Sequence, residues 1–219
     1  MPVVPHQFLF RYSFPVIYNA KLPRRGKQVL GFSSELALPH LGELDEQPAF
    51  AEVKIGWNEK GVGIAVNVLG KKHPPQCDIS SPDQTDCLQV WIDTRNTQSI
   101  HRASQYCHHF SLFPNRGGKE KASPVVLQRP IIHAREEAPL ADVKKIKQSV
   151  TISTKGYLLE TWFPATTLHG FDFEATSKIG FYYSLHDTEL GNQFLTVNRD
   201  FPFTHDPSLW STLDLLPEK

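Results

Sequence analysis

The spacing of prolines and glycines along the chain constrains its fold more than any other feature. Seventeen prolines and thirteen glycines among 219 residues interrupt short runs rich in Val, Ile, Phe, Tyr and Trp. Such interruption is typical of many short strands joined by turns. Strands are expected at residues 51–57, 62–69, 88–94, 108–113, 149–153, 157–163, 179–186 and 194–198.

Helical periodicity is almost absent from the sequence. The stretch 136–147 has helical propensity, but Pro139 interrupts it, so a loop fits equally well. The sequence therefore predicts an all-β fold, an antiparallel β-sandwich of the jelly-roll or immunoglobulin-like kind with little helix.

Alternation of apolar and polar residues predicts which face each strand buries. Along 51–57 the odd-numbered residues are apolar, whereas Glu52 and Lys54 take the other face. The tetrapeptide 58–61 then has the composition of a hairpin turn. In 88–93 the same rule sends one set of side chains inward (Leu88, Val90, Ile92) and the other outward (Gln89, Trp91, Asp93).

No long Gly/Ser or charged linker divides the chain, and β-sandwiches commonly reach roughly 200–250 residues as one unit. We therefore expect a single domain over residues 1–219, in which residues 1–44 wrap the sandwich.

The charge balance excludes a large class of partners. Lys plus Arg and Asp plus Glu both number 23, so no net field gathers phosphate or anionic lipid. The densest basic stretches, 21–27 and 144–147, are short and read as solvated surface. We expect neither nucleic acid nor membrane as a partner.

The start of the sequence and its cysteines both bear on the compartment. Residues 1–7 have no basic region followed by an apolar run, which predicts a cytoplasmic protein as written, or a secreted or periplasmic one if a leader is missing. Cys77, Cys87 and Cys107 cannot all pair within one chain, which favours a reducing compartment. A Cys77–Cys87 bridge remains an alternative.

Four segments in order resemble the family 9 carbohydrate-binding modules of the DOMON-like sandwich group. They are the hairpin strands 53–58 and 63–68, the strand 86–95, the strand 156–164 beginning Gly-Tyr-Leu-Leu-Glu, and the strand 179–187 beginning Ile-Gly-Phe, followed near the end by Asp-Pro-Ser-Leu-Trp at 206–210. The resemblance spans about residues 45–216 and implies a sandwich that binds mono- or oligosaccharides without catalysis.

The chain departs from this family where its sugar is held. The resemblance places two clamping tryptophans at the positions of Asp83 and Thr204, neither of which can stack on a pyranose ring. The family's polar sugar contacts fall at Gln89, Ser111 and Ser184, which keep hydrogen-bonding capacity but carry no charge. These differences predict a remodelled ligand site.

Strand alternation gathers polar and aromatic side chains on one outward sheet face. A ligand is predicted to bind there, at Gln89, Trp91, His109, Ser111, Tyr182, Ser184 and His186. The alternative is that this face is merely solvated, or is covered by the long segment 115–147.

Metal and catalytic signatures are weak. His101, His108, His109 and His133 cluster around Cys107, but adjacent strand residues face opposite ways and the spacing fits no standard zinc pattern, so no metal site is predicted there. The family resemblance leaves a structural calcium open.

The sequence has no Gly-x-Ser-x-Gly elbow, Gly-rich phosphate loop, His-Glu-x-x-His or Cys-x-x-Cys. Asp93 and Glu160 form the one carboxylate pair that could suggest a glycosidase, and we expect Glu160 instead to bond neighbouring backbone. A non-catalytic carbohydrate-binding domain is predicted. The alternative is a structural scaffold or protein-interaction domain that has lost sugar binding.

Overall fold

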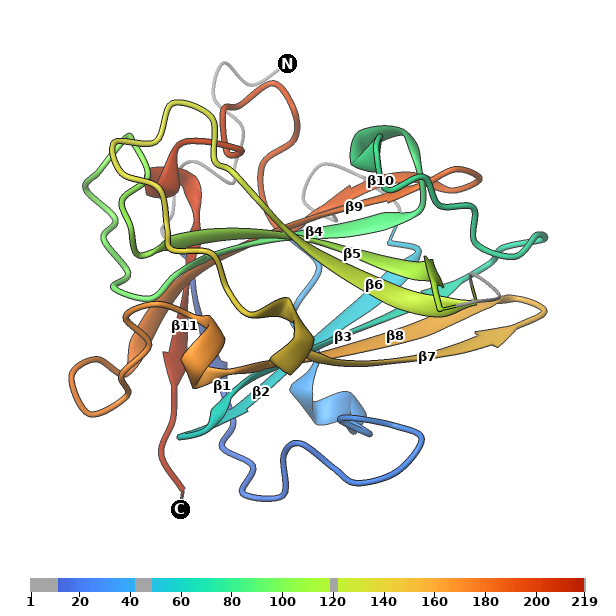
Figure 1. Ribbon diagram of the computed structural model, residues 1–219, viewed down its shortest axis with the longest axis horizontal. Helices are drawn as coiled ribbons and strands as arrows, with labels where there is room; N and C mark the ends of the chain where they lie inside the picture. The colour runs from blue at the N-terminus through green and yellow to red at the C-terminus, as the bar shows by residue number, and fades with distance from the viewer. Residues whose placement is uncertain (1–11, 42–48, 119–121, 219) are drawn as a thin grey trace.

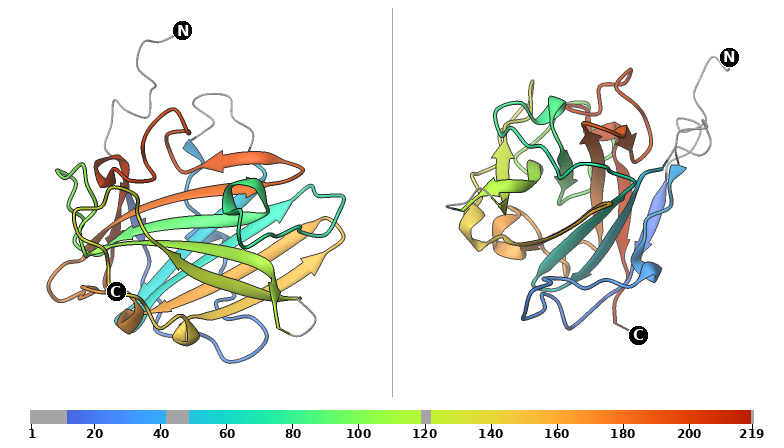
Figure 2. Two further views of the ribbon diagram at one scale, coloured as in Figure 1. Left: turned by 45° about the horizontal axis from the view of Figure 1, so that its top comes forward. Right: turned by 90° about the vertical axis from the view of Figure 1, so that its right-hand side faces the viewer.

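The computed structural model describes residues 12–41, 49–118 and 122–218 and consists of two β-sheets packed face to face (Figures 1 and 2). The seven-stranded sheet has the order β1 (Ser13–Val16), β11 (Ser211–Leu215), β9 (Lys178–Asp187), β4 (Cys87–Asp93), β5 (Cys107–Gly117) and β6 (Ser123–Arg129), and β10 (Gly191–Phe194) also pairs with β9. The four-stranded sheet has the order β2 (Ala51–Asn58), β3 (Gly61–Leu69), β8 (Gly156–Pro164) and β7 (Lys147–Ser153).

All strand pairs are antiparallel except β1 with β11. The only helical elements in the described residues are 3-10 turns: η2 (Ser34–Leu36), η4 (Pro82–Gln84), η5 (Val143–Lys145), η6 (Ala165–Thr167) and η7 (Pro207–Leu209). The predicted all-β sandwich is confirmed. The described part of the chain contains no helix long and apolar enough to cross a membrane.

The core between the sheets follows the predicted alternation. Val53, Ile55 and Trp57 of β2 are buried against the inward residues of β4, Leu88 and Ile92. The turn at 58–61 joins β2 to β3, with Asn58 paired with Gly61. Alternating apolar residues therefore fix both the register and the buried face.

Three strands were not predicted, and one predicted strand is wrong. The sequence signal missed β1 and β11, which have only four and five residues, and β6, which contains Pro124. Only Phe194 of the predicted strand 194–198 is in a strand, at the end of β10. The segment 136–147 is a loop ending in η5, as Pro139 allowed.

The cysteines are free thiols, and all three are buried. Cys77 and Cys87 pack in one small cluster with Phe113 but are not bonded to each other. Burial raises the pKa of the Cys77 and Cys107 thiols to about 12, so both stay protonated at neutral pH.

The N-terminal segment packs against the outer face of the four-stranded sheet, beneath the strands in Figure 1. Leu22, Val29 and Leu30 form an apolar cluster with Ala65 of β3 and Trp162 of β8. Gly63 permits this approach, because a Cβ there would lie 2.6 Å from a Leu30 methyl group. β1 extends the opposite sheet, so this part of the chain contacts both layers.

Glu160 fastens this segment to the sheet, which confirms its predicted structural role. Its carboxylate accepts hydrogen bonds from the backbone N–H of Val29 (3.0 Å) and of Gly31 (2.6 Å) and from the hydroxyl of Ser149 (2.8 Å). Glu160 is only 1% exposed, so these three donors take the place of the water molecules that would otherwise solvate its carboxylate.

Substitution Glu160→Ala is expected to destabilise the protein by roughly 2–4 kcal/mol, because the Gly31 N–H loses its acceptor and the Val29 N–H keeps only the Ser149 hydroxyl, at 3.1 Å. Glu52→Ala is the matched control, since the Glu52 side chain is 40% exposed and pairs with Lys54 at 2.8 Å, and its removal should cost under about 1 kcal/mol. Urea denaturation measures both. Equal losses in the two variants would show that Glu160 does not anchor the segment.

Candidate functional site

The strand register brings the predicted ligand-binding residues to one face. Gln89 lies opposite Ser111 of β5 and Ser184 of β9, while Trp91 lies opposite His109 and Tyr182. His186 pairs with Cys87, two residues before Gln89, and so shares the face. The prediction that these seven side chains share the outer face of the seven-stranded sheet is confirmed.

Other parts of the chain cover this face, as one of the alternatives left open by the sequence allowed. Trp91 is 1% exposed, Tyr182 0% and Gln89 5%, and Ser111 and Ser184 are also buried. Alternation identifies the face that a side chain occupies, but it does not say what packs on that face. Here two loops from distant parts of the sequence cover the sheet, above the strands in Figure 1.

The first loop, residues 198–206, is called the cover segment below. Its Phe203 stacks on Tyr182 with ring centroids 4.5 Å apart and meets the edge of Trp91 at 5.5 Å. The carbonyl of Phe203 accepts the indole N–H of Trp210 at 2.7 Å, which ties the segment to the start of β11. The second loop lies within the predicted covering segment 115–147 and buries Ile131 in the core cluster.

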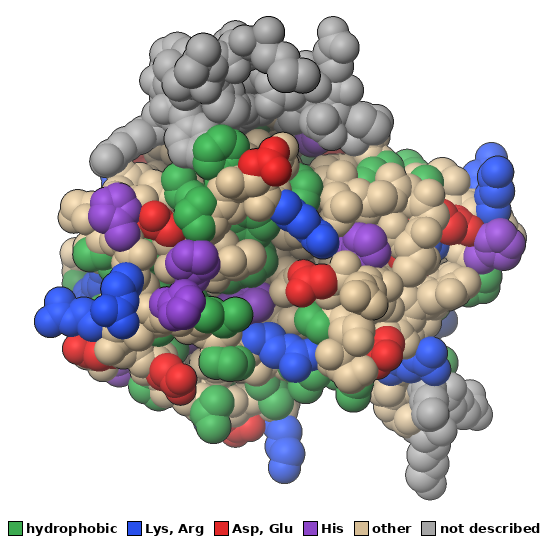
Figure 3. All heavy atoms as spheres, turned by 90° about the horizontal axis from the view of Figure 1, so that it is seen from above, with side chains coloured by type: hydrophobic (Ala, Val, Ile, Leu, Met, Phe, Trp, Pro, Cys, Tyr) green, Lys and Arg blue, Asp and Glu red, His purple; other side chains and the backbone are tan. Residues whose placement is uncertain are grey.

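A cavity of about 490 Å³ remains where the cover segment meets the sheet, and we call it the outer-face pocket. Its lining residues are Asp83, Gln89, Trp91, Ser184 and residues 199–205. Three predicted residues, Gln89, Trp91 and Ser184, therefore line it, whereas His109, Ser111, Tyr182 and His186 do not. Figure 3 views this side of the molecule, where acidic, basic and histidine side chains are interspersed.

The pocket also contains both positions at which the resemblance places clamping tryptophans, Asp83 and Thr204. Residues 199–203 and His205 were not predicted. They sit in a loop without strand periodicity, so alternation gave no signal for them. The one available signal was their position in the sequence, between strand β10 and the Asp-Pro-Ser-Leu-Trp motif at 206–210.

A hydrogen-bond chain runs from the floor of the pocket to its rim. The side-chain amide of Gln89 donates to Asp83 Oδ1 at 2.9 Å, and its oxygen lies 3.0 Å from His109 Nε2. His109 stacks on Trp91 with ring centroids 4.3 Å apart. Since Gln89 uses both ends of its amide, it positions the Asp83 carboxylate rather than being free for a ligand.

Several polar groups at the pocket have capacity left. The indole N–H of Trp91 is buried without a partner in the described residues. Arg199 donates from Nη2 to the Asp83 carbonyl (3.4 Å) and to Asn192 Oδ1 (3.2 Å), which holds its guanidinium at the rim. Buried donors normally have acceptors, so the Trp91 N–H calls for a ligand or water oxygen.

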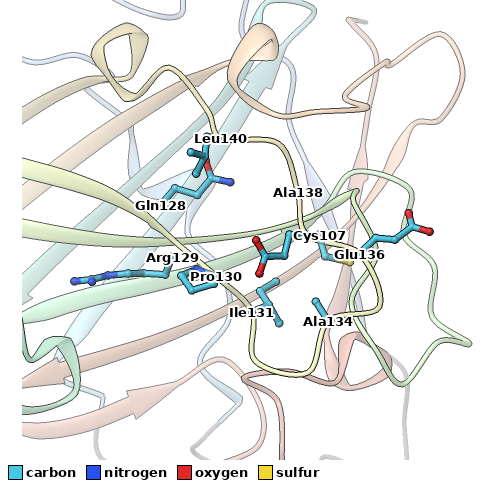
Figure 4. A pocket seen from close by; sticks show the side chains of 10 residues that line it. Cys107, Gln128, Arg129, Pro130, Ile131, Ala134, Glu136, Ala138 and Leu140 are labelled. Atoms are coloured by element: carbon cyan, nitrogen blue, oxygen red, sulfur yellow. The ribbon is translucent and has the colours of Figure 1, made fainter.

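A second cavity of about 310 Å³ lies beneath the loop that follows β6 (Figure 4). Cys107, Pro130 and Ile131 lie beside it, with Gln128 and Leu140 at one side. The raised pKa of Cys107 leaves it no thiolate for reaction at neutral pH. A third, of about 860 Å³, lies between residues 14–24, 35–39 and 216–218.

The clustered histidines do not converge. His108 and His109 face opposite ways as predicted, His101 Nδ1 lies 3.1 Å from Asp206 Oδ2, and His133 meets the edge of His205. Within residues 12–41, 49–118 and 122–218 no group of three or more His, Cys, Asp or Glu residues is arranged to hold a metal ion.

The two carboxylates that could suggest a glycosidase, Asp93 and Glu160, are also far from each other in the fold. Asp93 faces outward on the seven-stranded sheet and accepts from the backbone N–H of Arg95 and Thr97. Glu160 faces outward on the four-stranded sheet, against the N-terminal segment. The two sheets lie between these carboxylates, so they cannot flank one bond.

Comparisons with known proteins agree with this architecture. No protein-family model matches the chain, and no relative was found among the curated proteins. A family 9 carbohydrate-binding module from Caldicellulosiruptor kristjanssonii in complex with glucose superposes with a TM-score of 0.65 at 12% identity, over 95% of this chain and 97% of that one. The chain shares the fold of this module.

Two further solved structures are similar. The module from Caldicellulosiruptor kristjanssonii in complex with cellotriose has a TM-score of 0.63 at 12% identity, over 95% of each chain. A proposed carbohydrate-binding protein from Bacteroides uniformis has a TM-score of 0.57 at 12% identity, over 94% of this chain and all of that one. At this identity the likeness concerns the fold.

Burial lowers the pKa of His108 and of His109 to about 4, so both are neutral in the folded protein at pH 7. The unfolded chain takes up these protons near pH 6.5, whereas the folded protein does so only near pH 4. The free energy of unfolding should therefore fall as the pH drops from 6.5 to 4, by roughly 2–3 kcal/mol per histidine.

Urea denaturation between pH 7.5 and 4.5, with NMR titration of the ten imidazoles, measures this effect. Two histidines should remain neutral at pH 5. If all ten titrate between pH 6 and 7, the burial of His108 and His109 is disproved.

Proposed function

We propose that the chain is a non-catalytic carbohydrate-binding domain of the DOMON-like sandwich group, acting as one domain, with its ligand in the outer-face pocket. The observation that carries the proposal is the set of polar groups with spare hydrogen-bonding capacity beside aromatic rings in that pocket. The Trp91 N–H, the Arg199 guanidinium and the Asp83 carboxylate supply donors and an acceptor. A sugar needs such a mixture, because its hydroxyls donate and accept while its ring faces are apolar.

The fold likeness supports the proposal independently. The module from Caldicellulosiruptor kristjanssonii is described in complex with glucose and with cellotriose, and it superposes on nearly the whole chain. The pocket here includes the two positions assigned to the family's clamp, Asp83 and Thr204, so cavity and resemblance point to the same place.

The site would be remodelled relative to that family. With Asp83 and Thr204 in place of two tryptophans, stacking falls to rings such as Phe201 at the pocket wall. Each lost aromatic contact removes about 0.5–1.5 kcal/mol beyond area burial. Binding should therefore be weak, nearer millimolar than micromolar.

A second candidate function is a scaffold or protein-interaction domain without a sugar ligand. The observation that favours it is the exposure of Leu140 (89%), which lines the second cavity, and of Ile132 (67%), which follows the lining residue Ile131. Large exposed side chains of this kind occur at contact surfaces between proteins.

Calorimetric titration with glucose and cellotriose tests the first function. Asp83→Ala and Arg199→Ala should each weaken binding by about 5- to 10-fold, because each removes one charged hydrogen-bonding group from the pocket. Arg199 is exposed, so its loss should leave the thermal midpoint nearly unchanged, whereas Asp83→Ala also removes the acceptor of the buried Gln89 amide and should lower the midpoint by about 2–4 °C.

The matched controls are Glu174→Ala and Arg25→Ala, which remove exposed charges that do not line the outer-face pocket. They should bind as the parent does. If no saccharide binds the parent at millimolar concentration, the scaffold function is the better account. If binding occurs but survives Asp83→Ala and Arg199→Ala together, the ligand lies elsewhere.

A further inference from the structure

A buried ion cluster joins three strand-end and loop residues, none of which lines the outer-face pocket. The ammonium of Lys71 lies 2.9 Å from Asp86 Oδ2 and 2.7 Å from Asp187 Oδ2. The three side chains are 1%, 0% and 0% exposed, in that order. They come from the loop after β3, the residue before β4 and the end of β9.

The two carboxylates are held rigidly by the backbone. Asp86 accepts from the N–H of Gln76 (2.9 Å) and of Thr188 (2.7 Å), and from the Thr188 hydroxyl. Asp187 accepts from the N–H of Glu189 (2.9 Å) and of Leu190 (3.0 Å). Both carboxylates therefore keep their places independently of Lys71, with one oxygen each turned to the ammonium.

The charges of the cluster do not cancel. Two carboxylates and one ammonium leave one negative charge, and burial makes uncompensated charge costly. Burial by itself would lower the pKa of Lys71, but its hydrogen bonds to Asp187 and Asp86 and their charges outweigh burial and raise that pKa. Lys71 is thus a permanent cation at neutral pH.

A nearby polar group is left without a partner. The Tyr157 hydroxyl of β8 is buried and has no hydrogen-bond partner in the described residues. Burial raises the pKa of this phenol, and the negative charges of Asp86 and Asp187 raise it further.

The family resemblance leaves a structural calcium open, and these carboxylates are the residues to test for it. Calcium takes 6–8 oxygen ligands at 2.3–2.6 Å and cannot share its position with an ammonium. Lys71 Nζ occupies the point between the two carboxylates, so the chain as it stands does not fit calcium there.

We propose that Lys71 serves as a built-in replacement for a divalent cation, and that Asp86 and Asp187 form part of a latent calcium site that shortening Lys71 would open. The protein would then be stable without calcium, because the required positive charge is part of its own chain. The inference does not depend on sugar binding, since the cluster does not line the outer-face pocket.

Two variants of Lys71 distinguish the effect of losing its positive charge from the effect of opening space for an ion. Lys71→Ala removes the ammonium and makes room for an ion with its waters, whereas Lys71→Met removes the charge but keeps the space filled. Both should lower the thermal midpoint by roughly 10 °C, because two buried carboxylates lose their cation. Calcium at 10 mM should then raise the midpoint of Lys71→Ala by about 5 °C or more, and that of Lys71→Met by under about 1 °C.

The parent should shift by less than about 1 °C with 10 mM calcium or with a chelator, and elemental analysis should find no calcium. A parent destabilised by the chelator would overturn the proposal, as would Lys71→Ala that responds no more than Lys71→Met. If Lys71→Ala does not fold alone, refolding with calcium but not with a chelator supports the latent site. Failure to refold in both contradicts it.

Discussion

The packing of Phe203 on Trp91 and Tyr182 is the contact on which the rest of the candidate site depends. It fixes the cover segment to the seven-stranded sheet, with the Phe203 ring centroid 5.5 Å from that of Trp91 and 4.5 Å from that of Tyr182. Without it, the aromatic residues of β4 and β9 would be open to water, at a cost of roughly 1.5–3 kcal/mol for each large apolar side chain. Burying them leaves a bounded pocket instead of an open sheet face.

The outer-face pocket exists because the cover segment does not fill all of the space above the seven-stranded sheet. Phe203 fills the space above Trp91, while Arg199 reaches back across the rim to the loop that carries Asp83. The Gln89 amide joins that loop to His109 below. Polar groups are therefore held at the mouth over an aromatic floor, the combination on which saccharide binding is proposed to rest.

The same physical rule operates at the two outer faces of the sandwich. Glu160 holds the N-terminal segment on the four-stranded sheet through backbone donors, and Phe203 holds the cover segment on the other sheet through ring packing. Each face needed a partner because its strands carry apolar residues on both sides, Trp162 on one sheet and Trp91 on the other.

Local sequence was sufficient to predict most of the fold. Alternation in 51–57 and 88–93 identified the buried face, because a one-residue slip would have exposed every apolar side chain. Strands β1 and β11 were not predicted, because four or five residues give too short an alternation to recognise. Their parallel pairing also joins segments that are far apart in the sequence. Pairings between distant segments leave no local signal.

The candidate site was predictable only in part, for the same reason. Register placed Gln89, Trp91 and Ser184 together, and the resemblance pointed to Asp83 and Thr204. The cover segment has no periodicity, so neither Phe203 as the lid over Trp91 nor Arg199 at the rim followed from the sequence. An outward tryptophan reveals a face that needs covering, but the residue that covers it must be found in three dimensions.

The indole N–H of Trp91 is the most direct reporter of the central claim, that a saccharide binds in the outer-face pocket. The indole N–H groups of Trp57 and Trp210 already donate to carbonyl oxygens, whereas that of Trp91 has no partner in the described residues. Titration with cellotriose, followed by two-dimensional 1H–15N NMR, should shift the Trp91 indole signal together with backbone signals of residues 199–205. Saturable shifts confined to other residues, or none at millimolar sugar, would contradict the account.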